Sequence, residues 1–481
     1  MRPVLPTLHR VRTWIQGNRN DSWLSAALLG VAAIALGHAL QINDGFLHPD
    51  AIYWLTVAIV CAAAGVGLPR MSLLERLGIR LPIAVLGVGL ALQFTALFAK
   101  APGIYLHIAP GWQAPFFRGL TVAAMIAGSL LPARSGGKHL QVALLLGVFL
   151  ALGIWLIRAS PSPAIDVFTF QQQGSHALLH GHNPYSASFQ NIYRTAAFYN
   201  PRLVNNGRLA FGVPYPPLSL LLVLPAYLLA GDVRYAQLVA MILAAALMAY
   251  ARPGRLGAVA AALYLSTPRA FFVLEQAWTE PFVVLLASAV VFCACRWPRA
   301  MPYALGLLLA IKQYTVLALL PALWLLMPGP FDWRRQWQVT WKAGATALIV
   351  TLPLALADLP AFVRSVVMLQ WYQPFRFDAL SYLAWAVKAG EPVRGAGWTL
   401  AAAAVGLAIG LWRAPRTPAG FAATLALTSL GFFAFSKQGF CNYYYFVVGA
   451  LCLAVATSFD AGAITQNPTP QRATNLKVQD R

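Results

Sequence analysis

Charge is scarce in this sequence, and negative charge most of all. Of 481 residues only 10% are charged and 14 are Asp or Glu, whereas 59% are hydrophobic. Soluble domains carry about 25% charged residues. A chain with so little charge cannot cover a water-facing surface, so the composition excludes a soluble globular protein and indicates an integral membrane protein.

Cysteine is also rare, and no metal-binding arrangement of cysteines is present. The five Cys are Cys61, Cys293, Cys295, Cys441 and Cys452, mostly within or beside apolar segments. Structural zinc sites need paired cysteines or histidines at characteristic spacings, and these positions do not supply them. We therefore expect all five to act as packing residues.

Basic residues are more numerous but are dispersed. The 35 Lys and Arg give a net charge of +21 and occur in ones, twos and threes between apolar segments. Nucleic-acid binding would require a basic face or arm. Scattered basic residues at helix ends instead match anionic lipid headgroups, so we expect membrane lipids as partners and no nucleic acid.

Apolar segments long enough to enter a membrane recur along the chain and predict an all-α polytopic protein with about fourteen transmembrane helices. A further apolar segment, 216–230, is interrupted by Pro225, and we expect a helix that enters the outer leaflet, or lies at its surface, and returns. Three parts are predicted: an N-terminal transmembrane module at 1–138, a second module at 139–459, and a disordered cytoplasmic tail at 460–481. The predicted spans lie near 23–40, 51–68, 82–98, 119–132, 140–157, 235–251, 255–268, 281–295, 302–312, 315–328, 342–357, 397–412, 418–435 and 443–459.

The positions of Arg and Lys predict the orientation. Basic residues follow alternate spans, for example Arg255, Arg335 and Arg416, and such turns are typically cytoplasmic. The long polar connections 158–214 and 358–397 then face the outside. We therefore expect any chemistry or recognition on the extracytoplasmic side.

Among the few acidic residues, Asp166 is distinguished by its position a few residues after the span 140–157. A carboxylate there lies at the boundary between lipid and water, within reach of a substrate whose tail stays in the bilayer. The simpler alternative is an aspartate that caps the helix beginning at Val167. Position alone leaves both interpretations open.

The residues after Asp166 resemble the first outer loop of the GT-C superfamily of membrane glycosyltransferases. The similarity is closest to the bacterial polyprenyl-phosphate-mannose-dependent mannosyltransferases and related arabinofuranosyltransferases. Weaker likeness continues in Glu-Gln276-Ala-Trp-Thr-Glu280-Pro, Ile-Lys312-Gln-Tyr and Ser-Lys437-Gln438. The matching positions of the first loop are Asp166, Gly174, Leu178, Leu179, Gly181, Asn183, Pro184, Tyr185, Tyr215, Pro216 and Pro217.

The resemblance covers roughly residues 140–460, and the five spans before it depart from the family, whose catalytic Asp usually follows the first span. It implies a GT-C-like fold with a long first catalytic outer loop, in the bacterial cytoplasmic membrane. It also implies transfer of a sugar from a polyprenyl-phosphate donor to an extracytoplasmic glycan or lipid acceptor of the cell envelope. Asp166 would be the general base of an inverting reaction. No cofactor is expected.

Cations are needed to hold the departing phosphate, and three are candidates. Lys312 lies in an apolar hairpin, where a charge is costly and usually functional, although it could extend to the interface instead. Arg376 could simply pair with Asp378, and Lys437 could anchor a helix end. Glu280 is expected to grip a sugar, although a carboxylate at a helix start is also favoured by the helix dipole. The remaining expected substrate contacts are His180, Asn183, Tyr185, Tyr215, Gln276 and Gln438.

Two alternatives concern a metal and a different class of protein. His176, His180 and His182 have a spacing that can bind zinc, but His180 bonding a substrate or the loop is the more ordinary interpretation, and no Asp-x-Asp occurs. We therefore expect no metal. A transporter or flippase of a lipid-linked sugar would predict inverted repeats and paired broken helices. A noncatalytic scaffold is the third possibility, and the long outer loop with its isolated Asp166 favours an enzyme over both.

Overall fold

The protein is a helical bundle, seen in a computed structural model that describes residues 22–68, 71–108, 113–132, 138–193 and 198–458. The predicted tail 460–481 lies outside the described residues. Within them, six helices are long and apolar enough to cross a membrane, which supports the predicted all-α membrane protein. They are α2 (Trp23–Ile42), α3 (Pro49–Gly67), α5 (Arg80–Ala99), α7 (Lys138–Ala159), α10 (Arg234–Ala251) and α16 (Trp333–Ala357).

Other predicted spans are shorter apolar helices, and the shortest of them cannot cross a bilayer alone. α14, with 11 residues, extends only about 16 Å, against a hydrocarbon core of about 30 Å. It ends where Lys312 adopts an extended backbone. Length and composition therefore support six spans among the described residues, and the count of about fourteen stays a prediction. The shorter apolar helices are α6 (Ala114–Ser129), α9 (Pro217–Ala230), α11 (Leu256–Leu265), α13 (Glu280–Arg296), α14 (Met301–Ile311), α15 (Leu319–Leu325) with the 3-10 turn η2 (Gln313–Ala318), α20 (Gly397–Arg413), α21 (Pro418–Ala434) and α22 (Cys441–Thr457).

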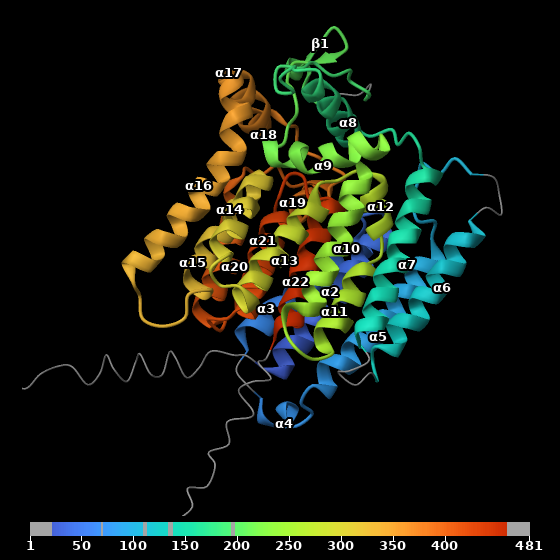
Figure 1. Cartoon of the computed structure of the whole chain (residues 1–481), viewed down its shortest axis with the longest axis vertical. Helices are drawn as coiled ribbons and strands as arrows, with labels where there is room; N and C mark the ends of the chain where they lie inside the picture. The colour runs from blue at the N-terminus through green and yellow to red at the C-terminus, as the bar shows by residue number, and fades with distance from the viewer. Residues whose placement is uncertain (1–21, 69–70, 109–112, 133–137, 194–197, 459–481) are drawn as a thin grey trace, which may run out of the picture.

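α22 lies near the centre of the bundle, and α2 of the N-terminal helices packs directly on it (Figure 1). Nearly every residue of α22 is buried, as expected for a helix that is apolar on all sides. α2, rich in Ala and Leu, packs against α3, α5 and α22, while α3 also contacts α20 and α21. The described helices of the predicted N-terminal module thus pack in one bundle with helices of the second module, and the division into modules stays a prediction.

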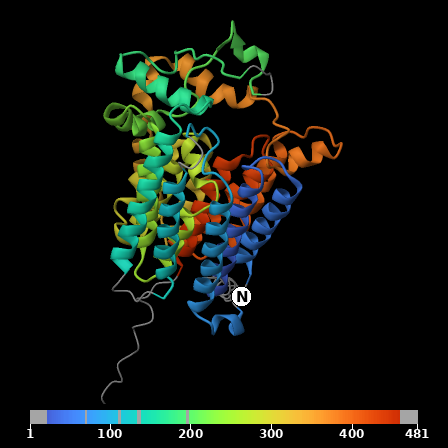
Figure 2. The same cartoon turned by 90° about the vertical axis from the view of Figure 1, so that its right-hand side faces the viewer.

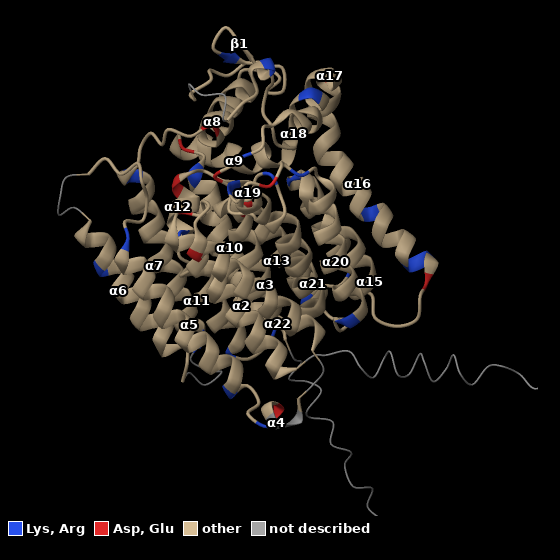
Figure 3. Cartoon of the chain, turned by 180° about the vertical axis from the view of Figure 1, so that it is seen from behind, with Lys and Arg blue, Asp and Glu red and all other residues tan. Residues whose placement is uncertain are grey.

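One end of the bundle, which we call the basic face, is defined by Arg255, Arg296, Arg413 and Arg416. Each donates hydrogen bonds to carbonyl groups on a neighbouring segment: Arg255 to Leu131 at 2.7 Å, and Arg413 to Gly67 at 2.7 Å. The last carbonyls of a helix have no intrahelical partner, and these guanidinium groups satisfy them. Charged residues are few along the middle of the bundle (Figure 3). These four arginines come from basic turns predicted to share a side, and the other turns of that set stay a prediction.

The opposite end, which we call the pocket face, carries the short elements that follow the long helices (Figure 2). They are α8 (Asp166–Leu179), η1 (Pro201–Leu203), the hairpin β1 (Val204–Asn205) and β2 (Arg208–Leu209), α12 (Ala270–Glu275), α17 (Leu359–Phe362), the π-helical turn η3 (Val363–Met368), α18 (Leu369–Tyr372) and α19 (Tyr382–Lys388); α4 (Ser72–Glu75) lies at the other end.

α9 begins and ends on the pocket face, as predicted for the segment interrupted by Pro225. At its start, the Tyr215 carbonyl accepts a hydrogen bond from the Tyr185 hydroxyl at 2.8 Å. At its end, the Gly231 carbonyl accepts one from the Gln172 amide of α8 at 2.5 Å. Both partners belong to the segment that follows α7, so α9 lies along the pocket face and does not cross the bundle.

Candidate active site

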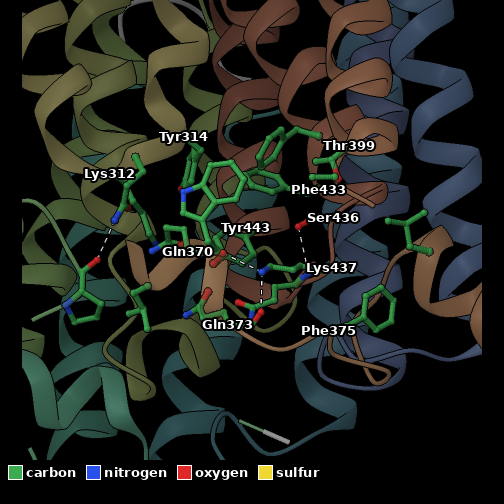
Figure 4. A pocket seen from close by; sticks show the side chains of 18 of the residues that line it. Lys312, Tyr314, Gln370, Gln373, Phe375, Thr399, Phe433, Ser436, Lys437 and Tyr443 are labelled. Carbon is green, nitrogen blue, oxygen red and sulfur yellow. Dashed lines mark hydrogen bonds between the residues drawn. The ribbon is translucent and has the colours of Figure 1, made fainter. Parts of the chain in front are cut away.

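A cavity of about 820 Å³ opens beneath α8 on the pocket face. Its walls come from the loop before α9, from the break between α14 and η2, from the segment 369–375, and from α20–α22. Figure 4 shows Lys312 on one side and Lys437 on the other, with Gln370 and Tyr443 between them in this view. The polar side chains that line the cavity are Asp166, Tyr199, Tyr215, Lys312, Gln313, Tyr314, Gln370, Gln373, Arg394, Thr399, Ser436, Lys437, Gln438 and Tyr443.

Asp166 is the first residue of α8, and its carboxylate faces the cavity. The hydroxyl of Tyr199 donates a hydrogen bond to Oδ2, and the Val167 amide donates one to Oδ1 at 2.7 Å. The Tyr193 hydroxyl accepts from the Asp166 backbone amide at 3.3 Å. The carboxylate is therefore held in place from several sides, which a solvated loop aspartate would not be.

The surroundings of Asp166 have opposite effects on its pKa. Burial raises the pKa of the carboxyl, and the hydrogen bond from Tyr199, the Val167 amide, Tyr193 and the charge of Arg376 each lower it by a smaller amount. The net pKa lies above the ordinary value of an aspartate. A carboxyl adjusted in this way binds a proton more readily than a solvated one, which suits a general base.

Replacing Tyr199 with Phe should shift the pH dependence of the reaction to higher pH. The variant loses a hydrogen bond that stabilises the charged form of Asp166, so the pKa of Asp166 rises further. A base must be ionised to act, so activity should appear only at higher pH, while activity well above the new pKa is largely retained. The pH profile of the activity that the motif resemblance implies, sugar transfer, is the measurement, and an unchanged acidic limb would exclude a role for Tyr199.

Lys312 and Glu280 form a buried ion pair across the contact between α13 and α14. The Lys312 ammonium bonds Glu280 Oε1, and the Tyr314 hydroxyl donates to the same oxygen at 3.3 Å. Three rings, those of Tyr215, Tyr314 and Tyr443, lie within 5.3, 5.6 and 5.2 Å of the ammonium. Glu280 is fully buried and does not line the cavity. Glu280 therefore contacts Lys312, and its direct contact with a sugar stays a prediction.

Lys437 differs from Lys312 because its described neighbours include no carboxylate. Its ammonium donates to the carbonyls of Gln370 and Gln373 at 2.9 and 2.7 Å. Burial lowers the pKa of Lys437, because no counterion offsets the loss of water. The other cavity-lining cations, Lys312 and Arg394, are paired with Glu280 and Glu391. Among the described residues, Lys437 is therefore the cation of this cavity that is most available to an anion.

Arg376 lies beside the cavity, not in its lining. It forms the predicted ion pair with Asp378, at 2.7 Å, and its guanidinium stacks between the rings of Phe198 and Phe440 at 4.2 and 4.7 Å. Its charge still lowers the pKa of Asp166. We infer an electrostatic influence on the site and not a direct substrate contact.

The remaining predicted contacts divide into two groups. Tyr215 and Gln438 line the cavity, as expected. Asn183 and Tyr185 instead hold the outer loop: Asn183 accepts from the Tyr185 amide at 2.9 Å, and the Tyr185 ring is buried.

His180 and Gln276 also lie outside the cavity lining. His180 is exposed at the end of α8 and bonds the His176 carbonyl at 2.8 Å. Gln276 is buried beside Glu275, to which it donates at 3.2 Å. Both residues are close to motif residues in the sequence, but in the folded chain neither side chain reaches the cavity.

Several lining residues were not predicted. Gln313 and Tyr314 follow Lys312 directly, so their motif was available as a signal. No signal in the sequence was available for four others, because neutral polar residues have many ordinary roles: Tyr199, Gln370, Gln373 and Tyr443.

A metal site finds no support in the described part of the chain, which contains no group of three or more His, Cys, Asp and Glu suited to hold an ion. His176 and His180 are stacked, with their ring centres 4.1 Å apart.

No known family model matches the chain, and neither a curated protein nor a solved structure is measurably similar to it. The resemblance to the GT-C superfamily therefore depends on the motif residues alone.

Proposed function

We propose that the chain is a membrane glycosyltransferase that uses a polyprenyl-phosphate sugar as donor. The observation that carries this proposal is that one cavity contains a hydrogen-bonded carboxylate, Asp166, and an available cation, Lys437. Transfer of a glycosyl group away from a phosphate requires both: a base for the acceptor and a positive charge for the leaving group.

In the proposed reaction, an acceptor hydroxyl attacks the anomeric carbon of the donor as its proton passes to Asp166. The bond between that carbon and the phosphate oxygen breaks, and the electron pair leaves with the phosphate, which Lys437 stabilises. Attack opposite to the leaving group inverts the anomeric configuration. The products are a glycosylated glycan or lipid and a polyprenyl phosphate.

The apolar part of the cavity suits the lipid portion of such a donor. Val316 of η2, Trp371 of α18 and Leu400 of α20 line the cavity and are also 61%, 78% and 63% exposed. In a membrane, exposed apolar side chains at the wall of a cavity would face lipid. A prenyl chain can therefore lie along these residues while its phosphate reaches Lys437.

The orientation follows from the basic face. Basic turns favour the cytoplasmic side, so the pocket face would lie outside the cytoplasmic membrane of a bacterium. Nucleotide sugars are not supplied there, which makes a lipid-linked sugar the practical donor. The likeness to mannosyltransferases and arabinofuranosyltransferases covers both hexosyl and pentosyl transfer.

Replacing Lys437 with Met should weaken binding of a polyprenyl monophosphate, the proposed product, by roughly ten- to a hundredfold, because losing a hydrogen bond to a charged group costs about 1.5–3 kcal/mol. Binding can be measured with the full chain in detergent. Lys388→Met, which removes a cation at the end of α19 outside the cavity lining, is the matched control and should bind normally. Equal affinity of the Lys437 variant and the unchanged chain would remove Lys437 from the phosphate site.

A further inference from the structure

We infer that the turn between α2 and α3, residues 43–47, is a positioning element of the candidate active site, a role for the N-terminal helices that rests on the proposed function. Three segments from distant parts of the chain lie side by side at the pocket face: this turn, the segment 376–380 and the segment 436–441. The last segment carries Lys437. Together we call them the three-segment clamp.

Backbone hydrogen bonds join the three segments in order. The Leu47 amide donates to the Asp378 carbonyl at 2.8 Å, and Phe46 pairs with Ala379 in an antiparallel bridge. The middle segment also bonds to the third segment. The Leu380 amide donates to the Gly439 carbonyl at 2.8 Å, and the Arg376 amide donates to the Lys437 carbonyl at 3.1 Å. The middle segment thus connects the N-terminal turn to the backbone of Lys437.

The first segment also contacts the third directly, at Gly45. Gly45 has a φ of +78°, which favours glycine, and a Cβ there would lie 2.6 Å from Cys441 Cβ and 2.7 Å from its backbone nitrogen. Real side chains do not approach so closely. The ring of Phe46 lies edge-on to Phe440, with centres 5.8 Å apart. The clamp therefore has space for glycine at this position and for nothing larger.

An ion cluster holds the turn in this conformation. Asp44, with a φ of +54°, accepts from Lys100 at the end of α5 at 2.5 Å and lies 2.7 Å from the guanidinium of Arg269, just before α12. Arg269 is almost completely buried. Removing one partner of such a buried pair is unfavourable, so the cluster fixes the turn to two neighbouring elements.

Fixing the clamp matters because Lys437 makes few contacts of its own. Its ammonium is held by two carbonyls of the segment 370–373, so its position depends on the backbone that carries it. A displacement of about 1 Å is enough to weaken a precisely placed charged contact. The N-terminal helices, which depart from the family pattern, thus contribute to phosphate binding without contacting the substrate.

The test is Gly45→Ala in the full chain, with Gly78→Ala as the matched control. Both glycines have a positive φ, +78° and +57°, but a Cβ at Gly78 would meet nothing within 4 Å. Each substitution is combined with Ser436→Cys, a position that lines the cavity next to Lys437. The rate of labelling by a polar thiol reagent reports the position of the third segment, with the same variants lacking the introduced cysteine as background. Polyprenyl monophosphate binding is measured in the single variants.

We expect Gly45→Ala to label severalfold faster at position 436 and to bind roughly tenfold more weakly, the lower limit for loss of a charged hydrogen bond, while Gly78→Ala changes neither. An unchanged labelling rate would overturn the inference that residues 43–47 position the third segment. Faster labelling with unchanged affinity would support the clamp and instead overturn the assignment of the phosphate to Lys437. If Gly45→Ala does not fold, Asp44→Asn, which weakens the ion cluster without adding volume, should give the same two changes, and their absence would again refute the inference.

Discussion

Asp166→Asn should abolish nearly all sugar transfer while leaving the protein folded and able to bind a polyprenyl phosphate. Asparagine keeps the size of the side chain and can still accept the hydrogen bond from the Val167 amide, while its NH2 group, in place of Oδ2, can donate to the Tyr199 hydroxyl. It cannot accept the proton of the acceptor hydroxyl. Because general-base catalysis typically contributes about 10²–10⁴-fold, turnover should fall by that factor. Transfer from a synthetic polyprenyl-phosphate sugar measures it, with thermal stability recorded in parallel.

The same variant separates the proposed enzyme from its alternatives. A residue that only caps α8 would tolerate the change, since Asn caps a helix about as well as Asp. A flippase would not need a base, and it would move the lipid-linked sugar at an unchanged rate. Near-normal turnover in Asp166→Asn would exclude Asp166 from the mechanism. Asp332→Asn, which changes an exposed carboxylate that caps α16 outside the cavity lining, is the control and should retain most activity.

Lys312→Met should destabilise the protein substantially, by about 3–5 kcal/mol, the usual cost of removing one partner of a buried ion pair. The variant leaves Glu280 without its cation, and the second carboxylate oxygen of Glu280 already has no hydrogen-bond partner among the described residues. The double variant Lys312→Met with Glu280→Gln removes both charges and should recover most of that stability. Unfolding in detergent, followed by denaturant titration, compares the three proteins.

The double variant also tests whether Lys312 contacts the donor, as the sequence predicted. If the ion pair is structural and the phosphate is bound by Lys437, the recovered protein should bind a polyprenyl monophosphate nearly as well as the unchanged chain. Weak binding despite recovered stability would instead return Lys312 to the phosphate site. Normal stability of the single Lys312→Met variant would show that Glu280 and Lys312 are not paired in the folded protein.

Much of the architecture could be predicted because hydrophobicity and basic turns are local signals. Each predicted apolar segment contains a helix, and Arg255 and Arg416 lie on the same face. Helix length was less predictable, because apolar residues continue past the point where α14 ends at Lys312. A broken helix and a continuous one have the same composition, and only packing against neighbours decides between them.

The candidate site was predicted in part. Asp166, Lys312 and Lys437 line one cavity although 271 positions separate the first from the last, and each attracted attention because a charge near a membrane is costly. His180 and Gln276 were expected there and are not in the lining. Proximity to a motif in the sequence does not determine the direction of a side chain after a helix end or a tight turn.

The helical class and the membrane character could be predicted from the sequence alone, because they depend on the composition of each segment and on its neighbours along the chain. Which charges are neutralised by an ion pair could be seen only in the tertiary structure. Glu280 pairs with Lys312 from 32 positions away, Asp44 joins Arg269, and no carboxylate among the described residues reaches Lys437. The cost of a buried charge depends on its partners in space, and those partners exist only once distant helices have packed together.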